Sequence, residues 1–281
     1  MSENRERCDV GLKKQQGIQS VKFEEPPIIC AAASVVGQKE GDGPFGDVFD
    51  QIESDPKVGG DTWEDAEGRL QERAAELAIQ KAGCGKEAIR YIVAGDLLGQ
   101  LMASSFGLAG FDKPLFGVYG ACSTMGESIG IGSMLVEGGF ADYVLAMTSS
   151  HFASAEKQFR FPLGYANQRP KASTWTVTGS GAVVICKGDQ KQGMAKITGI
   201  TTGKIVDYGV KDTMNMGACM APAAASVVAA HFKDFGTDPS EYDQIITGDL
   251  GMVGKDILID ILRSEGYDIA DRYIDCGIEI Y

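Results

Sequence analysis

One cysteine in this sequence stands where a nucleophile would be placed. Cys122 follows the apolar and aromatic run 115–119, which is typical of a buried strand, and precedes a stretch with helical spacing. Thr124 and Glu127 fit a capping box, so the sequence predicts a helix that begins beside Cys122 and stops at Gly138. A thiol at such a turn faces unpaired backbone N–H groups, which favour the thiolate and lower its pKa. The alternative is a small buried cysteine at a tight turn, the usual place of a free cysteine.

Two histidines could assist such a thiol. His151 follows a strand predicted for 143–147, and it could activate Cys122 only from within hydrogen-bond reach. The alternative for His151 is a structural side chain bonded to the backbone. His231 lies near the end of an alanine-rich helix predicted for 218–235, where a cation suits the helix dipole, and we expect it to be structural.

The segment 156–171 is basic within a strongly acidic chain. It carries Lys157, Arg160, Arg169 and Lys171, with aromatic residues interleaved. A flat aromatic dicarboxylate needs bidentate arginine partners and a ring to stack on, and this segment offers both. The alternatives are a solvated loop and a dimer contact. Long loops in compact domains often carry function, which favours ligand binding.

No metal site is predicted. The seven cysteines are scattered and form no CxxC pair, which fits a reducing compartment and gives no zinc site. The stretch 37–60 is rich in glycine, acids and proline, and its Gly41-Asp42-Gly43 lacks the ligand spacing of an EF-hand. We therefore expect a surface loop there.

Composition excludes several classes of protein. A net charge of −13 argues against a general binder of nucleic acid or anionic membranes, since either needs a basic footprint. The first 25 residues lack the apolar core of a signal peptide, and no apolar run reaches the roughly 20 residues that span a bilayer. With 281 residues the chain can form one large domain or two fused halves.

Strands and helices alternate along the chain, which favours a mostly parallel α/β sheet. Strands are predicted at 28–36, 91–94, 115–119, 143–147, 177–186, 195–201, 244–247 and 277–281. Helices are predicted from Thr62-Trp63-Glu64-Asp65 to Gly83, near 104–108, after Cys122, at 218–235 and at 255–264. The stretch 155–174 is expected to be irregular.

The two parts of the chain echo each other. The stretch 91–97 resembles 244–250: each is a short apolar strand followed by Gly-Asp-Leu, and each follows an alanine-rich helix that ends in glycine. A period near half the chain predicts a duplicated unit. Continuing the count brings Cys122 close to Cys276. Because Cys276 precedes an apolar run without a helix start, we do not pair the two cysteines.

Several long strings resemble the stage V sporulation protein AD family, over nearly the whole chain. They are Asp96-Leu97-Leu98, Tyr119-Gly120-Ala121-Cys122-Ser123-Thr124, Gly139-Phe140-Ala141-Asp142-Tyr143-Val144, Ser149-Ser150-His151-Phe152, Ala155-Glu156-Lys157-Gln158-Phe159-Arg160-Phe161-Pro162, Gln168-Arg169-Pro170, Trp175-Thr176-Val177-Thr178-Gly179, Ala221-Pro222-Ala223-Ala224-Ala225 and Asp275-Cys276-Gly277.

This resemblance implies a thiolase-like α/β fold, in which two pseudo-equivalent βαβαβαββ halves form a layered sandwich that is commonly dimeric. The chain then divides into a polar N-terminal segment 1–25, an N-terminal half 26–190 with a loop insertion 151–176, and a C-terminal half 191–281. Family members continue with a further helix and strands. The second half is therefore expected to be incomplete, without its last helix and two strands.

The resemblance also implies a function. The family takes part in moving dipicolinic acid, as its calcium chelate, into the developing spore, acting with membrane subunits of the uptake system and without established catalytic turnover. We therefore expect a protein of the spore or forespore, soluble or peripherally associated with the inner spore membrane through partners. No cofactor is expected, and Ca²⁺ only as part of the ligand. The residues expected to bind the ligand are Asp96, Ser123, Thr124, His151, Lys157, Arg160, Arg169 and Asp249.

One departure from related enzymes bears on chemistry. Ketoacyl-synthase-type enzymes place a histidine after the second strand of the second half, where this chain has Asp249. A carboxylate there repels a thiolate and cannot donate to a developing oxyanion unless it is protonated. The alternative function is a cysteine-dependent acyltransferase, with a thioester on Cys122 and His151 as the base. A ligand-binding role, with Cys122 as the floor of an inherited pocket, is the preferred interpretation.

Overall fold

The structure is a computed structural model that describes residues 14–159, 172, 174–188, 193–212 and 214–281. Its largest element is a mixed sheet in the order β4-β3-β8-β7-β5-β6. The strands are β3 (Ile28–Gly37), β4 (Gln51–Glu53), β5 (Tyr91–Gly95), β6 (Leu115–Gly117), β7 (Tyr143–Ser150) and β8 (Gly179–Cys186), and β9 (Ala195–Lys196) also pairs with β3.

Strand direction in this sheet follows the connections. The neighbours β5–β7 and β5–β6 are parallel and are joined through helices, whereas β8 runs antiparallel to both β7 and β3. The inner strands are apolar on both faces, which is typical of a sheet covered on both sides. The strands predicted for 28–36, 91–94, 143–147 and 177–186 are confirmed, with β7 extending three residues further.

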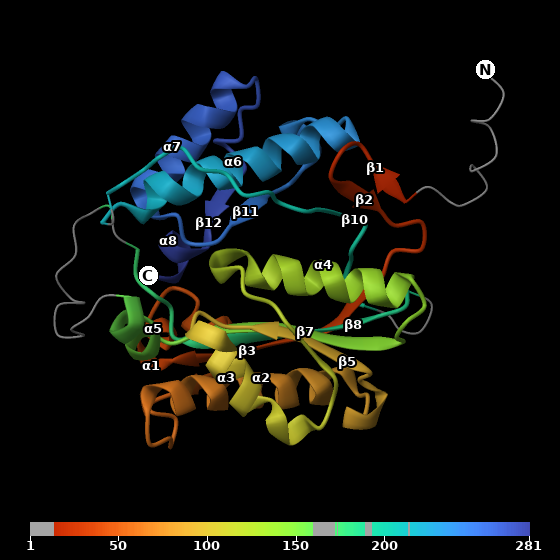
Figure 1. Cartoon of the computed structure of the whole chain (residues 1–281), viewed down its shortest axis with the longest axis vertical. Coiled ribbons are helices and arrows are strands. Elements are labelled where there is room, and N and C mark those ends of the chain that lie inside the picture. The colour runs from red at the N-terminus through yellow and green to blue at the C-terminus, as the bar shows by residue number, and fades with distance from the viewer. Residues whose placement is uncertain (1–13, 160–171, 173, 189–192, 213) are drawn as a thin grey trace.

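Helices cover both faces of this sheet, as Figure 1 shows. On one side lie α2 (Trp63–Ala82) and α3 (Met102–Gly107), and on the other lies α4 (Thr124–Glu137). Thr62 caps α2 by accepting a hydrogen bond from Asp65 N, and Gly83 ends it in the left-handed conformation, as predicted. Leu70, a residue of α2, is completely buried, and burial of such a side chain stabilises the fold by roughly 1.5–3 kcal/mol.

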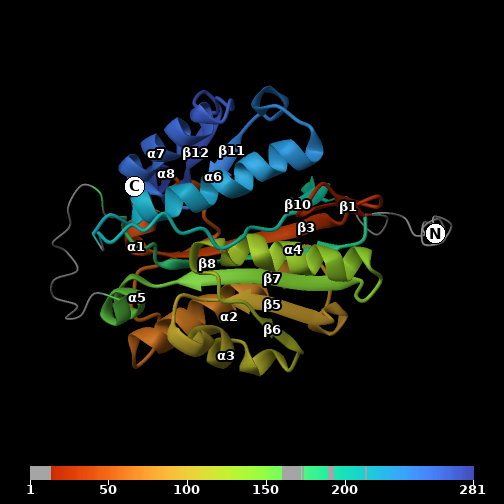
Figure 2. The ribbon, with the colours of Figure 1, turned by 45° about the horizontal axis from the view of Figure 1, so that its top comes forward.

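The remainder of the chain forms a smaller assembly above α4 (Figures 1 and 2). It contains α6 (Met216–Phe235), α7 (Gly251–Ser264), α8 (Cys276–Ile280) and the parallel pair β11 (Ile245–Thr247) and β12 (Tyr273–Asp275). A separate three-stranded sheet joins β1 (Gln15–Gln16), β2 (Ser20–Lys22) and β10 (Gly199–Thr201). These helices pack around their own buried core, which includes Phe232, Leu258 and Leu262.

Several local predictions were wrong. The stretch 37–60 is not all loop, because α1 (Gln38–Gly41), a 3-10 turn (Gly46–Val48) and β4 form within it. No strand was predicted in the polar stretch 1–25, but its described part forms β1 and β2, which pair with each other, and β2 also pairs with β10. The stretch expected to be irregular after 155 overlaps α5 (Phe152–Phe159).

The predicted strand ends were also corrected. The run 115–119 forms only a three-residue strand, and it is exposed because it lies at the edge of the sheet. The last apolar run, expected as a strand, is the helix α8, since Asp275 accepts hydrogen bonds from Gly277 N and Ile278 N and so caps a helix. The strand β12 before it had not been predicted.

Candidate functional site

The turn that carries Cys122 depends on close backbone packing at the ends of β5 and β6. A Cβ on Gly95 would lie 1.9 Å from the carbonyl oxygen of Val118, so only glycine allows this approach. A 3-10 turn (Ala121–Ser123) then leads into α4. Ala121 has a φ of +48°, a strained conformation for a residue with a side chain.

Hydrogen bonds within this turn differ from the predicted capping box. The hydroxyl of Thr124 accepts from Gly120 N at 3.2 Å, while Ser123 Oγ donates to Gly120 O at 2.9 Å and contacts the Glu127 carboxylate. The helix begins where it was predicted, but its first residue has no side-chain cap of the expected kind. Thr124 is buried, and Ser123 is exposed beside Cys122.

Cys122 lies between the two assemblies. Its Sγ is 3.8 Å from the Sδ of Met220, on α6. Cys122 is exposed as a residue, but partial burial of its thiol beside the second assembly raises the thiol pKa, and the nearby Asp249 carboxylate raises it further. The prediction of a low pKa was therefore wrong, because the helix N-terminus was considered without the residues that fold over it.

Asp249 lies near both Cys122 and Cys276, since its carboxylate affects the pKa of each thiol. The Asp249 side chain packs directly on Gly277, where an added Cβ would lie 2.1 Å from Asp249 Cγ. Burial raises the pKa of the Cys276 thiol, with Asp275 and Asp249 contributing further. Cys276 is the first residue of α8. The sequence analysis did not pair Cys276 with Cys122 because no helix was predicted to begin there, and this reason no longer holds.

Both ring nitrogens of His151 are hydrogen-bonded to the backbone. Its Nδ1 accepts a hydrogen bond from Ala153 N at 3.1 Å, which leaves Nε2 to donate to Pro56 O at 2.8 Å. The ring is 2% exposed, and burial lowers its pKa, so the neutral form is favoured. His151 therefore has the structural role, bonded to the backbone, that the sequence analysis gave as its alternative.

Asp96 is also placed inside the fold. Its Oδ1 accepts from Leu98 N at 2.8 Å, and its Oδ2 accepts from the backbone N and the hydroxyl of Ser104 at 2.7 and 2.6 Å. The residue is 1% exposed. It therefore orders the loop between β5 and α3, and the structure does not bring it to the surface with Asp249, its counterpart in the sequence echo.

The basic segment is only partly described. Lys157, on α5, places its Nζ 2.7 Å from Glu64 Oε1 on α2. Arg160, Arg169 and Lys171 lie outside the described residues. His231 is held between Thr201 Oγ1 and the Tyr242 hydroxyl at 2.9 and 2.7 Å, as expected for a structural histidine.

Sequence reasoning missed a buried polar network beneath the site. Glu67 on α2 accepts hydrogen bonds from the hydroxyls of Ser149 at 2.8 Å and Ser154 at 2.6 Å. Gln71, one turn later, donates to Ser149 at 2.8 Å and to Ser104 at 3.0 Å. Burial raises the Glu67 pKa to about 7. The available signal was the pair of polar residues four apart on the apolar face of α2.

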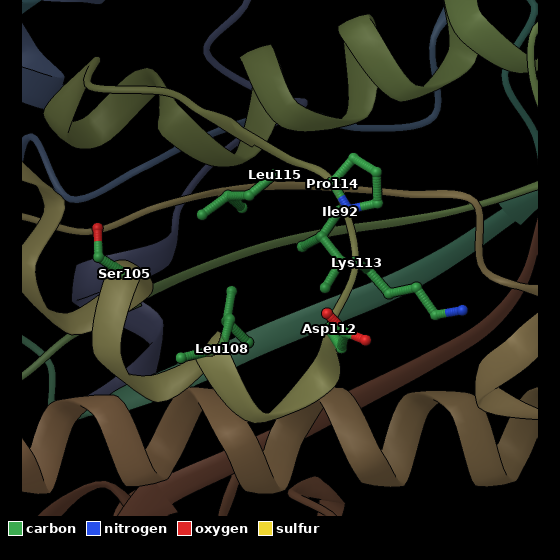
Figure 3. Close-up of a pocket in the computed structure, with 8 residues that line it drawn as sticks. Ile92, Ser105, Leu108, Asp112, Lys113, Pro114 and Leu115 are labelled. Carbon is green, nitrogen blue, oxygen red and sulfur yellow. The ribbon is translucent and has the colours of Figure 1, made fainter.

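A surface cavity of about 440 Å³ lies elsewhere, beside β6 (Figure 3). Its lining comes from β5, from the end of α3 and from the loop that enters β6, and none of the residues of the Cys122 turn lines it. The sequence analysis named no residue of this cavity as a site.

The described residues contain no group of three or more histidine, cysteine or acidic side chains placed to hold a metal ion. None of their helices combines the length and the apolar character that a membrane crossing requires.

Comparison with known proteins gives two kinds of match. The family model described as stage V sporulation protein AD matches residues 17–281. The stage V sporulation protein AD of Bacillus subtilis (strain 168) is 44% identical over 268 residues, covering 95% of this chain and 78% of that relative.

Solved structures with low sequence identity share the fold. The 3-oxoacyl-(acyl carrier protein) synthase III of Xanthomonas oryzae pv. oryzae is 17% identical with a TM-score of 0.59, over 92% of this chain and 86% of that one. Cerulenin-bound OleA of Xanthomonas campestris is 14% identical with a TM-score of 0.60, over 92% and 84%. The predicted thiolase-like fold is confirmed.

Proposed function

This chain belongs to the stage V sporulation protein AD family, and from that membership we propose that it is a binding protein for dipicolinic acid without catalytic turnover. In this proposal it holds the calcium chelate of dipicolinic acid for uptake into the developing spore. The crevice between Cys122 and Asp249 is the proposed ligand site. The strongest support for binding without turnover is the environment of the Cys122 thiol.

Acyl transfer through Cys122 would need a thiolate and a base to form it. Burial and Asp249 raise the pKa of this thiol, so the thiolate is disfavoured. The chain has two histidines, and both ring nitrogens of each are engaged in hydrogen bonds within the fold. The raised pKa of the thiol and the hydrogen bonds of the two histidines therefore favour ligand binding over thioester formation on Cys122.

The charge of the crevice favours the chelate over free dipicolinate. Free dipicolinate carries two negative charges and would be repelled by Asp249, whereas its 1:1 calcium chelate is neutral. Calcium takes six to eight ligands and prefers oxygen, so the chelate keeps positions open for a protein carboxylate. Asp249 would then become a ligand of the bound calcium.

We propose fewer ligand contacts than the sequence analysis expected. Ser123 and Asp249 are proposed to touch the ligand, and Arg160 and Arg169 are proposed to hold its carboxylates from the segment that follows α5. Asp96, Thr124 and His151 are buried and would support the site without touching the ligand. Lys157 would keep α5 on α2 through Glu64.

Partners are proposed on the same basis. We infer that the protein acts with membrane subunits of the dipicolinate uptake system and reaches the inner spore membrane through them. We also infer a homodimer formed around β6. That strand is one of the two edges of the large sheet, and Phe106, Leu115 and Phe116 are exposed on and beside it.

Calorimetry tests the ligand proposal. The protein is titrated with dipicolinate, with Ca²⁺, and with both together. Saturable heat is expected only when both are present and form the chelate. Asp249→Asn should weaken that binding by about tenfold, as loss of one charged contact would. Cys122→Ala should bind normally, and Arg263→Ala, an exposed arginine of α7, serves as the control. Absence of saturable heat from a folded sample would overturn the proposal.

The acyltransferase alternative has its own readout. Intact mass after incubation with acyl-CoA should show no adduct. An adduct that disappears in Cys122→Ala would instead establish a thioester and make the protein an enzyme.

A further inference from the structure

Two cysteines lie at the end of the large sheet where β3 and β7 begin. Cys186 ends β8 and pairs across the sheet with Tyr143, the first residue of β7. Cys30 is the third residue of β3, and its thiol donates a hydrogen bond to Val184 O at 3.4 Å. Both β6 and β7 run parallel to β5, and Cys122 follows the end of β6. The two thiols are therefore at the opposite end of the sheet from the proposed ligand site.

A third cysteine reaches the same place from α2. Cys84 follows Gly83, the residue that ends α2. Because α2 connects β3 with β5, and these strands run in the same direction, α2 must return to the end of the sheet where β3 begins. Cys30, Cys84 and Tyr143 all pack against the buried core between α2 and the sheet, to which Val184 belongs.

The Tyr143 side chain lies near all three thiols. Burial raises the pKa of its hydroxyl, and the charges of ionised Cys186, Cys30 and Cys84 raise it further. An effect of this kind weakens with distance, so each sulfur atom lies within electrostatic reach of one hydroxyl. The three thiols do not form a metal site, since the described residues contain no such group. Thiols that lie together can instead be oxidised to a disulfide.

Cys30 and Cys84 differ from Cys186 in access and in backbone freedom. Cys186 is fully buried within a regular antiparallel pairing, whereas Cys30 and Cys84 are partly exposed. The register of β3 against β8 shifts at Cys30, as in a bulge. Cys84 lies between two glycines, of which Gly83 has a φ of +60°. A disulfide needs its two Cα atoms about 4.4–6.8 Å apart, and the bulge and the glycines allow both segments to adjust toward that distance.

We infer that Cys30 and Cys84 form a redox-sensitive pair, which hydrogen peroxide converts to a disulfide between the start of β3 and the end of α2. Cys30 donates its S–H to a carbonyl oxygen, so the Cys84 thiolate attacks the peroxide first. That step forms a sulfenic acid on Cys84 and releases hydroxide, which takes up the thiol proton to give water. The Cys30 thiol then attacks the sulfenic sulfur and expels a second water. Two electrons and two protons pass from the thiols to one peroxide.

The disulfide should change the stability of the protein. It would close a loop from residue 30 to residue 84 and so restrict the unfolded chain. At the urea concentration that unfolds half of the reduced protein, the ratio of folded to unfolded molecules should rise by at least about tenfold on oxidation. Dithiothreitol should reverse the change.

Peptide mapping tests the pairing without any dipicolinate. The reduced full chain is treated with hydrogen peroxide, blocked with iodoacetamide and cleaved by trypsin without reduction. Cleavage after lysine places Cys30 in the peptide 23–39, Cys84 in 82–86 and Cys186 in 172–187. The expected product is the peptide 23–39 joined to 82–86 with the loss of two hydrogen atoms. The oxidised protein should remain a single chain on a non-reducing gel.

Matched variants connect the bond to the stability change. Cys84→Ser and Cys30→Ser should each abolish both the joined peptide and the gain in stability. Cys219→Ser, a change at an exposed cysteine of α6, is the control and should keep both. Urea unfolding of each reduced variant checks that it folds.

Three outcomes would overturn the inference. The first is the absence of the joined peptide at peroxide concentrations that already oxidise Cys219. The second is a bond from Cys84 to Cys186 in place of Cys30. The third is a bond between two copies of the chain.

Discussion

The Sγ of Cys122 lies 3.8 Å from the Sδ of Met220, so the turn that begins α4 is in contact with the helix that covers it from the other half. This contact accounts for the difference between the expected reactive thiolate and the thiol with a raised pKa. The helix N-terminus alone would lower the pKa, but burial and the Asp249 carboxylate act in the opposite direction and are larger.

Alkylation of Cys122 should therefore be slow. At pH 7 its rate with iodoacetamide should fall below that of a cysteine in an unstructured peptide, because less thiolate is present. Asp249→Asn removes one cause of the raised pKa and should speed the reaction several-fold. Peptide mapping is required, since Cys219 and Cys276 are also exposed. An unchanged rate in Asp249→Asn would show that this carboxylate does not control the thiol.

Glu67 should make stability depend on pH. Its pKa rises from 4.5 to about 7 on folding, so its contribution is full below pH 4.5 and is lost as pH rises through 7. The loss amounts to about 3 kcal/mol. Urea unfolding across this range should show Glu67→Gln lacking that decrease. Glu72→Gln, an exposed change on the same helix, should retain it. Parallel profiles for wild type and Glu67→Gln would contradict the assignment.

The two echoed aspartates should respond differently to the same change. Asp96→Asn exchanges a carboxylate that accepts three hydrogen bonds for an amide that cannot satisfy all three donors, so unfolding free energy should fall by roughly 2–3 kcal/mol. Asp249→Asn acts at a half-buried wall and should change stability by less than about 1 kcal/mol. Chemical denaturation of both variants measures the two losses of unfolding free energy. Equal losses would mean that Asp249 is structural too.

Dimerisation should depend on the edge strand β6. Phe116→Lys places a charge on an exposed apolar edge that the dimer would bury, and it should convert the dimer to monomer in sedimentation or light scattering. Ile18→Lys, another exposed apolar position, should leave the dimer intact. A dimer that survives Phe116→Lys would locate the interface elsewhere.

Local patterns predicted the inner strands of the large sheet and the start of α4, because apolar runs and caps are properties of neighbouring residues. Position within the sheet is a tertiary property. The run 115–119 is as apolar as an inner strand, yet β6 is exposed because no strand follows it at that edge. In α8, the Asp275 cap outweighs the strand-like composition of Gly277 to Tyr281.

The sequence indicated which residues lie near Cys122 better than it indicated their surroundings. Asp249 lies close enough to Cys122 to raise the pKa of its thiol, whereas a ligand site between these two residues stays a prediction. Whether a polar residue is buried depends on what folds over it, so the sequence could not show that Asp96 and His151 are enclosed. For the same reason Glu67, enclosed by serines from β7 and α5, was missed.

The pairing of β3 with β8 constrains the order in which the protein can fold during its synthesis. Ile28 lies opposite Cys186, so strands from the two ends of the first half must meet before the sheet is complete. A nascent chain can assemble β5, β6 and β7 with their helices. The strand β3 cannot join this sheet until β8, which lies between β3 and β7, has been synthesised. Contacts of such long sequence separation slow folding and leave strand edges open meanwhile. A slower rate of translation after β7 would therefore lengthen the period in which β3 is open to aggregation.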